Sequence, residues 1–539
     1  MDKRARKRVT RAIFGAAAVA AATATAFAGG PALAATSGQR AATPSLNSAS
    51  LNSASHNSAQ TATPIKHLVV IYQENHSFDN YFATYPHAAN PAGEPQFHAA
   101  PGTPKVNGLS HELLTHNRNL ANPYRLDRSQ EITCDNNHDY TPLQKAYDGG
   151  LLDRFVQEVG PNYDSCDPTL TMGHYDGNTV TALWNYAQHF AMSGNVFNDT
   201  FDPSTPQALN LISGQTHGAV PSAPTPAVAN GTLIGNLVPT HDDCDASGVQ
   251  NPTTVEMTGK NIGDLLNAKN VTWGWFTGGF RPTSHVNGKA VCGSSHDNIA
   301  GVPQNDYYNG EDNPFQYYAS TNNEHHVPPS SPAAVGYSDQ AHHQYGLADF
   351  WSAADHGRMP AVSFLRAPSY AQGHPGYSDP LDEQQFLVST VNRIERLPSW
   401  RSTAVVITWD ESDGWYDHVM PPIVNASNDP ANDALDGPSG LCGTPKPGAY
   451  LDRCGYGTRI PELVISPWSK TNFVDHSLTA QSSIIAFVEA NWALGHIGDQ
   501  SFDTRSGTIA GMFHFQHPSA RRLFLDPSTG EPVLVGGHR

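Results

Sequence analysis

Short apolar runs rich in β-branched residues recur along the chain and constrain its fold more than any other feature. Each run is almost wholly apolar instead of alternating with polar residues, and polar residues follow it. A strand that is covered on both faces needs this continuous pattern, which is typical of parallel sheets. We therefore expect buried strands at 68–71 (LVVI), 361–365 (AVSFL), 404–408 (AVVIT) and 463–465 (LVI), and a strand that ends near Val196-Phe197.

Two segments between these runs have apolar residues at helical spacing. Residues 382–397 and 478–494 each place their large apolar side chains on one face, as a helix packed on a sheet requires. Strands that alternate with helices predict an α/β fold, in which helices sandwich a mostly parallel sheet.

The stretch 218–345 has a different composition. Gly, Pro, Asn and His dominate it, and no clear apolar period is present. We interpret 218–345 as long loops or an insertion that forms a cap over the site. The expected catalytic domain spans 65–520, and residues 521–539 form a C-terminal tail.

The first residues have the features of an export signal. Basic residues between Lys3 and Arg11 precede an Ala-rich run, and Ala32-Leu33-Ala34 resembles a signal-peptidase site. The alternative is a membrane anchor, but the run is weakly apolar and shorter than the roughly 20 residues that a bilayer needs. We predict a cleaved signal peptide at 1–34 and a secreted protein. Residues 35–64, rich in Ser, Asn and Ala, are expected to be a disordered leader.

The net charge of the chain and its hydropathy argue against two classes of binding partner, nucleic acids and the interior of a membrane. Its formal net charge is -18, which argues against a nucleic-acid binder that works by neutralising phosphates. No later segment is apolar enough to suggest stable membrane insertion. A small phosphorylated substrate is still compatible with this charge, because a bound cation reverses the local field.

Six cysteines, none of them in a CxxC motif, argue against a zinc ribbon. An even number in an exported chain indicates disulfides. Many pairings are possible, and we favour the sequential set, in which each bond closes a local loop.

Polar clusters directly follow two of the expected strands, at 73–79 (QENHSFD) and 409–414 (WDESDG). Ligands gather at the carboxyl ends of the strands in an α/β sheet. These clusters contain Glu74, Asn75, Asp410 and Glu411, whose oxygens are ligands that hard divalent cations prefer. The alternative is that the acidic residues only cap the helices that follow.

A turn at 201–207 (FDPSTPQ) carries two hydroxyl residues, Ser204 and Thr205, between prolines. A hydroxyl on such a turn, beside a cation, can attack phosphorus. The first turn of an ordinary helix often has the same composition. The turn alone therefore does not show whether either hydroxyl is a nucleophile.

Four histidines lie in polar loop contexts instead of apolar runs: His138, His325, His326 and His374. Such side chains can stabilise phosphoryl oxygens or protonate a leaving group. Most surface histidines have no such role.

Taken together, these segments resemble the bacterial phospholipase C / acid phosphatase (phosphoesterase) family, whose catalytic domain is alkaline-phosphatase-like. The resemblance covers approximately 65–492. It is carried by 65–82 (IKHLVVIYQENHSFDNYF), 409–422 (WDESDGWYDHVMPP), 459–461 (RIP), 464–468 (VISPW) and by Asp475-His476, expected to open the last helix.

The resemblance implies a role for each candidate residue. Glu74, Asn75, Asp410 and Glu411 would bind one divalent metal ion, which could be Ca, Mg, Mn or Zn; relatives often have aspartate at the position of Glu411. Ser204 matches the nucleophile of the family turn G-P-[ST]-x-P-N, with Asp202 in place of Gly and Gln207 in place of Asn, and Thr205 is the alternative. His138, His325, His326 and His374 would line the phosphate pocket, and His374 would protonate the leaving alcohol.

The expected function is therefore that of a secreted, metal-dependent hydrolase of phosphoric esters, with a phosphate-ester substrate and a phosphoserine intermediate. Phosphodiesters such as phospholipids and phosphomonoesters are both possible substrates, so a phospholipase C and an acid phosphatase remain alternatives. The larger choline-lipid enzymes carry C-terminal β domains, which we do not expect here. A third reading, suggested by 20 Tyr and 9 Trp, is a secreted protein that binds without catalysis.

Overall fold

The computed structural model describes residues 60–161, 166–244, 252–304, 307–519 and 521–533. The expected signal peptide and most of the expected leader lie outside these ranges. The last residues of the leader are described, and they contact helix α10 (Ser483–Trp492). The backbone N–H of Ala62 donates to the carbonyl of Asn491 at 2.8 Å, and the Thr63 hydroxyl donates to the Asn491 side chain. Defined structure therefore begins a few residues before Ile65.

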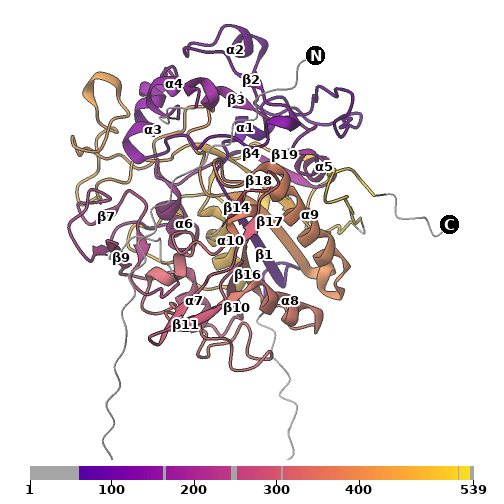
Figure 1. Cartoon of the computed structure of the whole chain (residues 1–539), viewed down its shortest axis with the longest axis vertical. Helices are drawn as coiled ribbons and strands as arrows, with labels where there is room; N and C mark the ends of the chain where they lie inside the picture. Colours follow the sequence, from indigo (N-terminus) through magenta and orange to yellow (C-terminus); the bar gives the residue numbers. More distant parts are fainter. Residues whose placement is uncertain (1–59, 162–165, 245–251, 305–306, 520, 534–539) are drawn as a thin grey trace, which may run out of the picture. The chain divides into compact units, whose positions relative to one another are not determined.

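A mixed nine-stranded sheet lies at the centre of the described structure (Figure 1). Its strands, in spatial order, are β15 (Gln344–Gly346), β10 (Trp273–Thr277), β16 (Val362–Arg366), β1 (His67–Gln73), β17 (Thr403–Trp409), β18 (Arg459–Ile465), β4 (Ala191–Phe197) and β19 (Phe473–Asp475), with β20 (Thr479–Ala480) also paired to β4. All the strands that the apolar runs predict are present. The mostly parallel α/β architecture is confirmed.

Strand β18 is the exception to the parallel arrangement. It pairs antiparallel with both of its neighbours, β17 and β4, whereas we expected the run at 463–465 to form a parallel strand. Its first residue, Arg459, lies opposite Phe197, the last residue of β4. The reversed direction therefore places Arg459 at the edge of the sheet where the parallel strands end.

Helices cover both faces of the sheet, so its strands are buried on both sides (Figure 1). Val69 and Ile71 of β1 pack in one core with α5 (Thr181–His189), α8 (Leu347–Asp355) and α9 (Pro380–Arg396). Leu68 and Val70 pack in the other core with α6 (Ser204–Ser213), α7 (Ile262–Ala268) and α10. The continuous apolar runs reflect this two-sided burial.

The two expected helices are present with altered ends. Helix α9 matches the prediction at 382–397. Helix α10 begins later than expected, because Thr479–Ala480 forms β20 instead of the first helical turn. Asp475 ends β19, so it does not open the last helix.

The remaining short elements surround this core. The helices are α1 (Phe78–Phe82), α2 (His111–Thr115), α3 (Tyr140–Tyr147) and α4 (Phe155–Glu158). The strands are β2 (Tyr124–Arg125), β3 (Gly173–His174), β5 (Ala219–Pro221), β6 (Val228–Ala229), β7 (Thr232–Leu233), β8 (Val238–Pro239), β9 (Thr254–Met257), β11 (Ser284–Val286), β12 (Lys289–Val291), β13 (His296–Asp297) and β14 (Pro303–Gln304). No helix of the described ranges is both long and apolar enough to cross a bilayer.

Two segments differ from the expected domain plan. Within 218–345, strands β10 and β15 belong to the main sheet, so this stretch is not purely loops or an inserted cap. The described part of the expected tail at 521–539 packs on α9, where the N–H groups of Leu523 and Leu525 donate to Glu395 and Asn392. Both segments are therefore part of the folded body.

Three disulfides join the six cysteines in sequential order, as we expected: Cys134–Cys166, Cys244–Cys292 and Cys442–Cys454. Each bond closes a local loop, and no cysteine remains free.

A buried ion network ties the first motif to β18. Arg459 Nη2 lies 3.0 Å from Asp79 Oδ1 and 3.0 Å from Asp417 Oδ2, and His418 Nδ1 lies 2.5 Å from Asp79 Oδ2. Burial would raise the pKa of Asp79, but the positive charges of His418 and Arg459 outweigh it and lower this pKa. Four of the motif residues, Asp79, Asp417, His418 and Arg459, therefore form a buried structural network.

We predict that Asp79→Ala lowers the free energy of unfolding by about 3–5 kcal/mol, because it leaves the Arg459 charge buried beside fewer partners. Chemical denaturation followed by tryptophan fluorescence measures this change. The matched control is Asp355→Ala, which breaks the exposed pair with Arg393 and should change stability by about 0–1 kcal/mol. Equal effects of the two substitutions would contradict a structural role for the network.

Candidate active site

Three neighbouring strands bring the candidate residues together at their carboxyl ends. Strand β1 pairs in register with β17 up to Gln73 and Trp409, and with β16 up to Tyr72 and Arg366. The pairing continues one step further, since the N–H of Asp410 donates to the Gln73 carbonyl at 3.0 Å. The register therefore places Glu74 and Asn75, Asp410 and Glu411, and Arg366 side by side.

Ser204 is the first residue of α6, which follows the carboxyl end of β4. Its side chain interacts with Asp410 and lowers the pKa of that carboxyl, although burial raises this pKa more strongly, to about 6. Ser204 is 5% exposed and Thr205 is 0% exposed. Of the two hydroxyl residues, the structure thus gives Ser204 both the contact with Asp410 and the greater exposure.

The carboxylate of Glu74 lies close to three other side chains. Its Oε1 pairs with the Arg366 guanidinium. Its Oε2 accepts a hydrogen bond from the Tyr377 hydroxyl at 3.1 Å and lies 3.7 Å from His374 Nε2. Arg366 also contacts Asp312 Oδ2 at 2.9 Å, so one buried cation joins two carboxylates.

His138 and His374 lie in a second part of the same cluster, with Asp135 and Asp413. One ligand atom from each of these four residues lies within 4.8 Å of the others. His138 Nδ1 is 3.4 Å from Asp413 Oδ1, and its Nε2 is 3.9 Å from Glu411 Oε1. The cluster therefore adjoins Glu411.

Burial affects the two histidines differently. It lowers the pKa of His374 to about 4, so this imidazole is neutral near neutral pH. Burial would also lower the pKa of His138, but the charges of Glu411 and Asp413 raise it well above its ordinary value. His138 is therefore the imidazole that carries a proton.

A close backbone approach fixes the position of Asp413. Gly414 has a φ of +70°, and a Cβ there would lie 2.6 Å from the Asn137 carbonyl oxygen. Only glycine suits this position. The contact holds the loop of Asp413 against the segment that carries His138.

Several buried oxygens of the cluster have no hydrogen-bond partner among the described residues. They are both carboxylate oxygens of Asp410 and one side-chain oxygen each of Glu74, Asn75, Asp135, Glu411 and Asp413. Burial raises the pKa of Glu411 well above its ordinary value, although the charge of His138 acts in the opposite direction. A divalent cation would satisfy the oxygens and the charge together, so the residues present fit a metal ion.

His325 and His326 do not join His138 and His374, contrary to our expectation of one phosphate pocket. His326 Nε2 lies 2.7 Å from Asp242 Oδ1, its Nδ1 lies 2.6 Å from the Phe280 carbonyl, and its side chain is fully buried. His325 is largely exposed and pairs with Asp243 at 2.8 Å. Both histidines hold the segment around the Cys244–Cys292 disulfide.

Sequence reasoning missed five residues of the site: Asp135, Arg366, Asp312, Tyr377 and Asp413. Arg366 directly follows an expected strand at 361–365, so the rule that found Glu74 and Asp410 would also have found it. Asp413 lies inside the polar cluster at 409–414. No sequence signal marks Asp312, which tertiary packing alone brings to Arg366.

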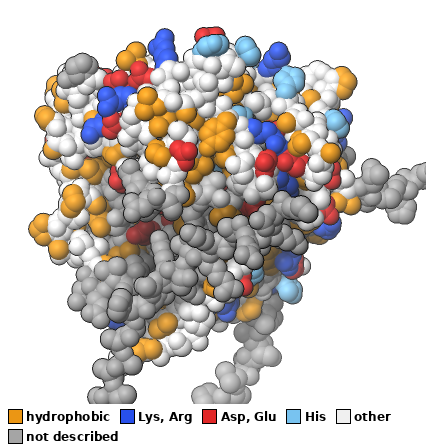
Figure 2. Space-filling model, turned by 45° about the horizontal axis from the view of Figure 1, so that its top comes forward, with side chains coloured by type: hydrophobic (Ala, Val, Ile, Leu, Met, Phe, Trp, Pro, Cys, Tyr) orange, Lys and Arg blue, Asp and Glu red, His pale blue; other side chains and the backbone are white. Residues whose placement is uncertain are grey.

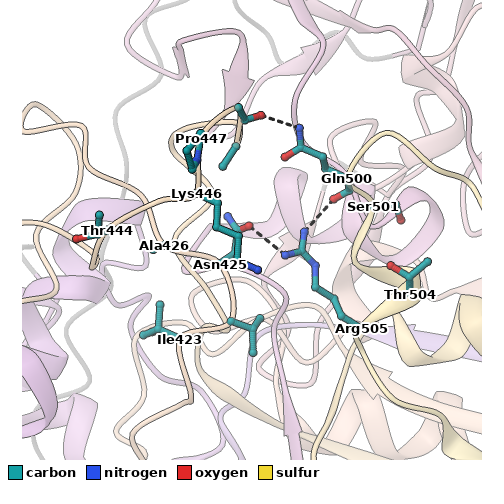
Figure 3. Close-up of a pocket in the computed structure, with 13 residues that line it drawn as sticks. Ile423, Asn425, Ala426, Thr444, Lys446, Pro447, Gln500, Ser501, Thr504 and Arg505 are labelled. Atoms are coloured by element: carbon teal, nitrogen blue, oxygen red, sulfur yellow. Dashed lines mark hydrogen bonds between the residues drawn. The ribbon is translucent and has the colours of Figure 1, made fainter.

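Two features of the outer surface, its charge distribution and a hollow, lie apart from the candidate catalytic residues. On the face drawn in Figure 2, the described basic, acidic and apolar side chains are mixed, without a continuous basic area. A hollow of about 620 Å³ lies between the loops 423–449 and 500–505 (Figure 3). There Arg505 donates to Asn425 Oδ1 and to the Gln500 carbonyl. None of the candidate catalytic residues lines this hollow.

Comparison with known proteins identifies relatives for most of the chain. The model of the Phosphoesterase family matches residues 65–495. The chain is 24% identical over 459 residues to a non-hemolytic phospholipase C of Burkholderia pseudomallei (strain K96243), a match that covers 80% of this chain and 56% of that protein. It is 24% identical over 505 residues to phospholipase C A of Mycobacterium tuberculosis (strain H37Rv), with coverage of 88% and 84%.

The chain spans less than two thirds of the B. pseudomallei protein and of a Pseudomonas aeruginosa non-hemolytic phospholipase C, of which 60% is covered. Among solved structures, murine ectonucleotide pyrophosphatase/phosphodiesterase 5 is similar at a TM-score of 0.31 and 10% identity, covering 62% of this chain and 94% of that one. An alkaline phosphatase superfamily protein of Vibrio parahaemolyticus gives a TM-score of 0.28 at 11% identity, with coverage of 58% and 60%.

We predict that Asp410→Asn folds but loses bound divalent cation. The amide is nearly isosteric with the carboxylate, but it lacks the negative charge and one of the two oxygens that would bind the cation. Metal content after equilibrium dialysis against Mn²⁺, measured by inductively coupled plasma mass spectrometry, tests this. Asp355→Asn, an exposed change of the same chemistry, is the control and should keep the wild-type content. Full metal content in Asp410→Asn would remove this residue from the ligand set.

Proposed function

The chain belongs to the phosphoesterase family, as its motifs indicated, and we propose that it is a secreted, metal-dependent hydrolase of phosphoric esters with Ser204 as nucleophile. One observation carries the proposal: the Ser204 side chain interacts with Asp410, at the carboxyl ends of strands whose buried oxygens lack partners. A hydroxyl beside such a group of ligands is the arrangement that attack on phosphorus requires.

Ser204 forms and breaks the covalent bond in this mechanism. Its Oγ gives up its proton to solvent and attacks phosphorus in line, the ester oxygen leaves with a proton from an imidazole, and a phosphoserine remains on α6. Water then attacks phosphorus, the Oγ–P bond breaks, phosphate or a phosphomonoester is released, and Ser204 regains its hydroxyl proton. A divalent cation held by Glu74, Asn75, Asp410 and Glu411 would supply positive charge that lowers the pKa of the Ser204 hydroxyl and offsets charge on the phosphoryl oxygens.

Two imidazoles can move the protons. We expected His374 to protonate the leaving alcohol, but its lowered pKa of about 4 makes it a poor acid at neutral pH. His138, kept protonated by Glu411 and Asp413, is the better donor. We assign the donor role to His138.

Two findings support the choice of substrate and compartment. The relatives that match most of this chain are phospholipases C, so we propose a phosphodiester, with a phospholipid as the first candidate. The three disulfides are typical of an oxidising compartment and support secretion. The surface hollow of Figure 3 has no part in this proposal.

We expect the purified chain to hydrolyse bis-p-nitrophenyl phosphate and phosphatidylcholine, to lose this activity in EDTA, and to regain it when a divalent cation is added. Release of p-nitrophenol and of phosphocholine measures the two reactions. Activity on p-nitrophenyl phosphate alone would identify a phosphomonoesterase instead. An absence of hydrolysis with every cation tested would favour a non-catalytic protein.

A pair of adjacent substitutions tests the nucleophile. Ser204→Ala should fold, keep its metal and lose several orders of magnitude in kcat, because no other hydroxyl can form the covalent intermediate. Thr205→Ala should keep substantial activity, since Thr205 is fully buried. Single-turnover assays with bis-p-nitrophenyl phosphate compare the two. The reverse pattern would move the nucleophile to Thr205, and two active variants would remove this turn from the mechanism.

A further inference from the structure

Three side chains of the kind that bind metal ions meet near the end of α10. Glu489 lies in the last turns of α10, Asp503 lies in the 3-10 helix η8 (Phe502–Thr504), and His496 lies in the loop between them. One ligand atom from each of the three lies within 4.8 Å of the others. None of the three belongs to the candidate active site, so this group, the α10 cluster, is a separate feature.

The α10 cluster holds more buried negative charge than its neighbours balance. The side chains of Glu489 and Asp503 are only 2% and 1% exposed. Among the described residues, no lysine or arginine forms an ion pair with either carboxylate, and His496 is the partner of both. The structural network around Asp79, by comparison, contains the buried Arg459. One imidazolium balances a single carboxylate, and the second buried charge still needs a counter-charge.

The hydrogen bonds of the α10 cluster position both carboxylates and leave donor atoms for a ligand. The backbone N–H of Ile497 donates to Glu489 Oε1 at 3.2 Å and to Asp503 Oδ2 at 2.9 Å. Asp503 Oδ1 is buried and has no hydrogen-bond partner within the ranges that the structure describes. Such an oxygen needs a partner, and a bound cation would provide one.

The spacing of the donor atoms fits a tetrahedral ion. His496 Nδ1 lies 2.9 Å from Glu489 Oε2 and 3.7 Å from Asp503 Oδ2. Tetrahedral zinc, with ligand bonds of about 2.0–2.2 Å, places its donor atoms about 3.3–3.6 Å apart, a separation between the two observed distances. One imidazole and two carboxylates are ligands that zinc accepts, with water in the fourth position. The two carboxylates also balance the charge of one divalent ion.

We propose that Glu489, His496 and Asp503 bind a structural zinc ion, separate from the ion of the candidate active site. The zinc joins the end of α10 to η8 and fixes the loop between them. It takes no part in ester hydrolysis. The proposal therefore does not rest on the proposed function, and either one can fail without the other.

The zinc content of the full chain tests the site, after dialysis against EDTA and then against Zn²⁺. We expect His496→Ala to hold one zinc ion per chain fewer than the wild type, by inductively coupled plasma mass spectrometry. The same substitution in the Asp410→Asn chain should also remove one ion, which separates the α10 cluster from the candidate active site. His356→Ala, which replaces an exposed histidine at the end of α8, is the control and should keep the wild-type content.

Thermal unfolding provides a second measurement. Zn²⁺ should raise the melting temperature of the Asp410→Asn chain by several degrees, because a ligand that binds only the folded state stabilises it. Adding His496→Ala should remove most of this rise.

The side chain of His496 is largely exposed, so its loss should not unfold the chain. Glu489→Gln, which keeps the shape of the buried side chain, should remove the same ion, and circular dichroism checks the fold of both variants. Equal zinc contents with and without the His496 side chain would overturn the zinc site. The proposed function would remain intact if that chain still hydrolysed phosphoric esters.

Discussion

The in-register pairing of β1 with β16 and β17 determines where the chemistry of this protein can occur. Parallel strands that pair in register end at the same edge of the sheet. The residues that follow these strands, 74–75 and 410–411, therefore lie close together. Ser204 reaches this edge because β4 runs in the same direction and opens directly into α6. Packing on both sheet faces holds the register, because a one-residue slip would move each side chain to the opposite core, which is shaped for other side chains.

Charge is the second constraint, and two of the buried arginines respond to it in different ways. Arg459 balances Asp79 and Asp417 and joins the first motif to the reversed strand β18. Arg366 balances Glu74 and Asp312 inside the candidate site. The first network is complete without a ligand, whereas the second leaves the oxygens of Asp410 without partners. This difference separates a structural ion network from a site that fits a cation.

The long motifs therefore serve two purposes within a few residues. In 73–79, Glu74 and Asn75 face the site, and Asp79 belongs to the structural network. In 409–422, Asp410 and Glu411 face the site, and Asp417 belongs to the network. Each motif thus contributes residues to both the candidate site and the structural network, and contacts are needed to separate them. Contacts also separate the four candidate histidines. His138 and His374 lie together at the site, whereas His325 and His326 contact other residues.

The sequence by itself determined the α/β class, the central strands and the clusters around Glu74 and Asp410, because burial on both faces and turn chemistry are local properties of the chain. It did not determine the direction of β18, the place of β10 in the sheet, or the separation of His326 from His138. Those features depend on contacts between residues far apart in sequence, such as Arg366 with Asp312 and Arg459 with Asp79. Only the tertiary structure decided them, since the partner of a buried charge is set by packing and leaves no local pattern.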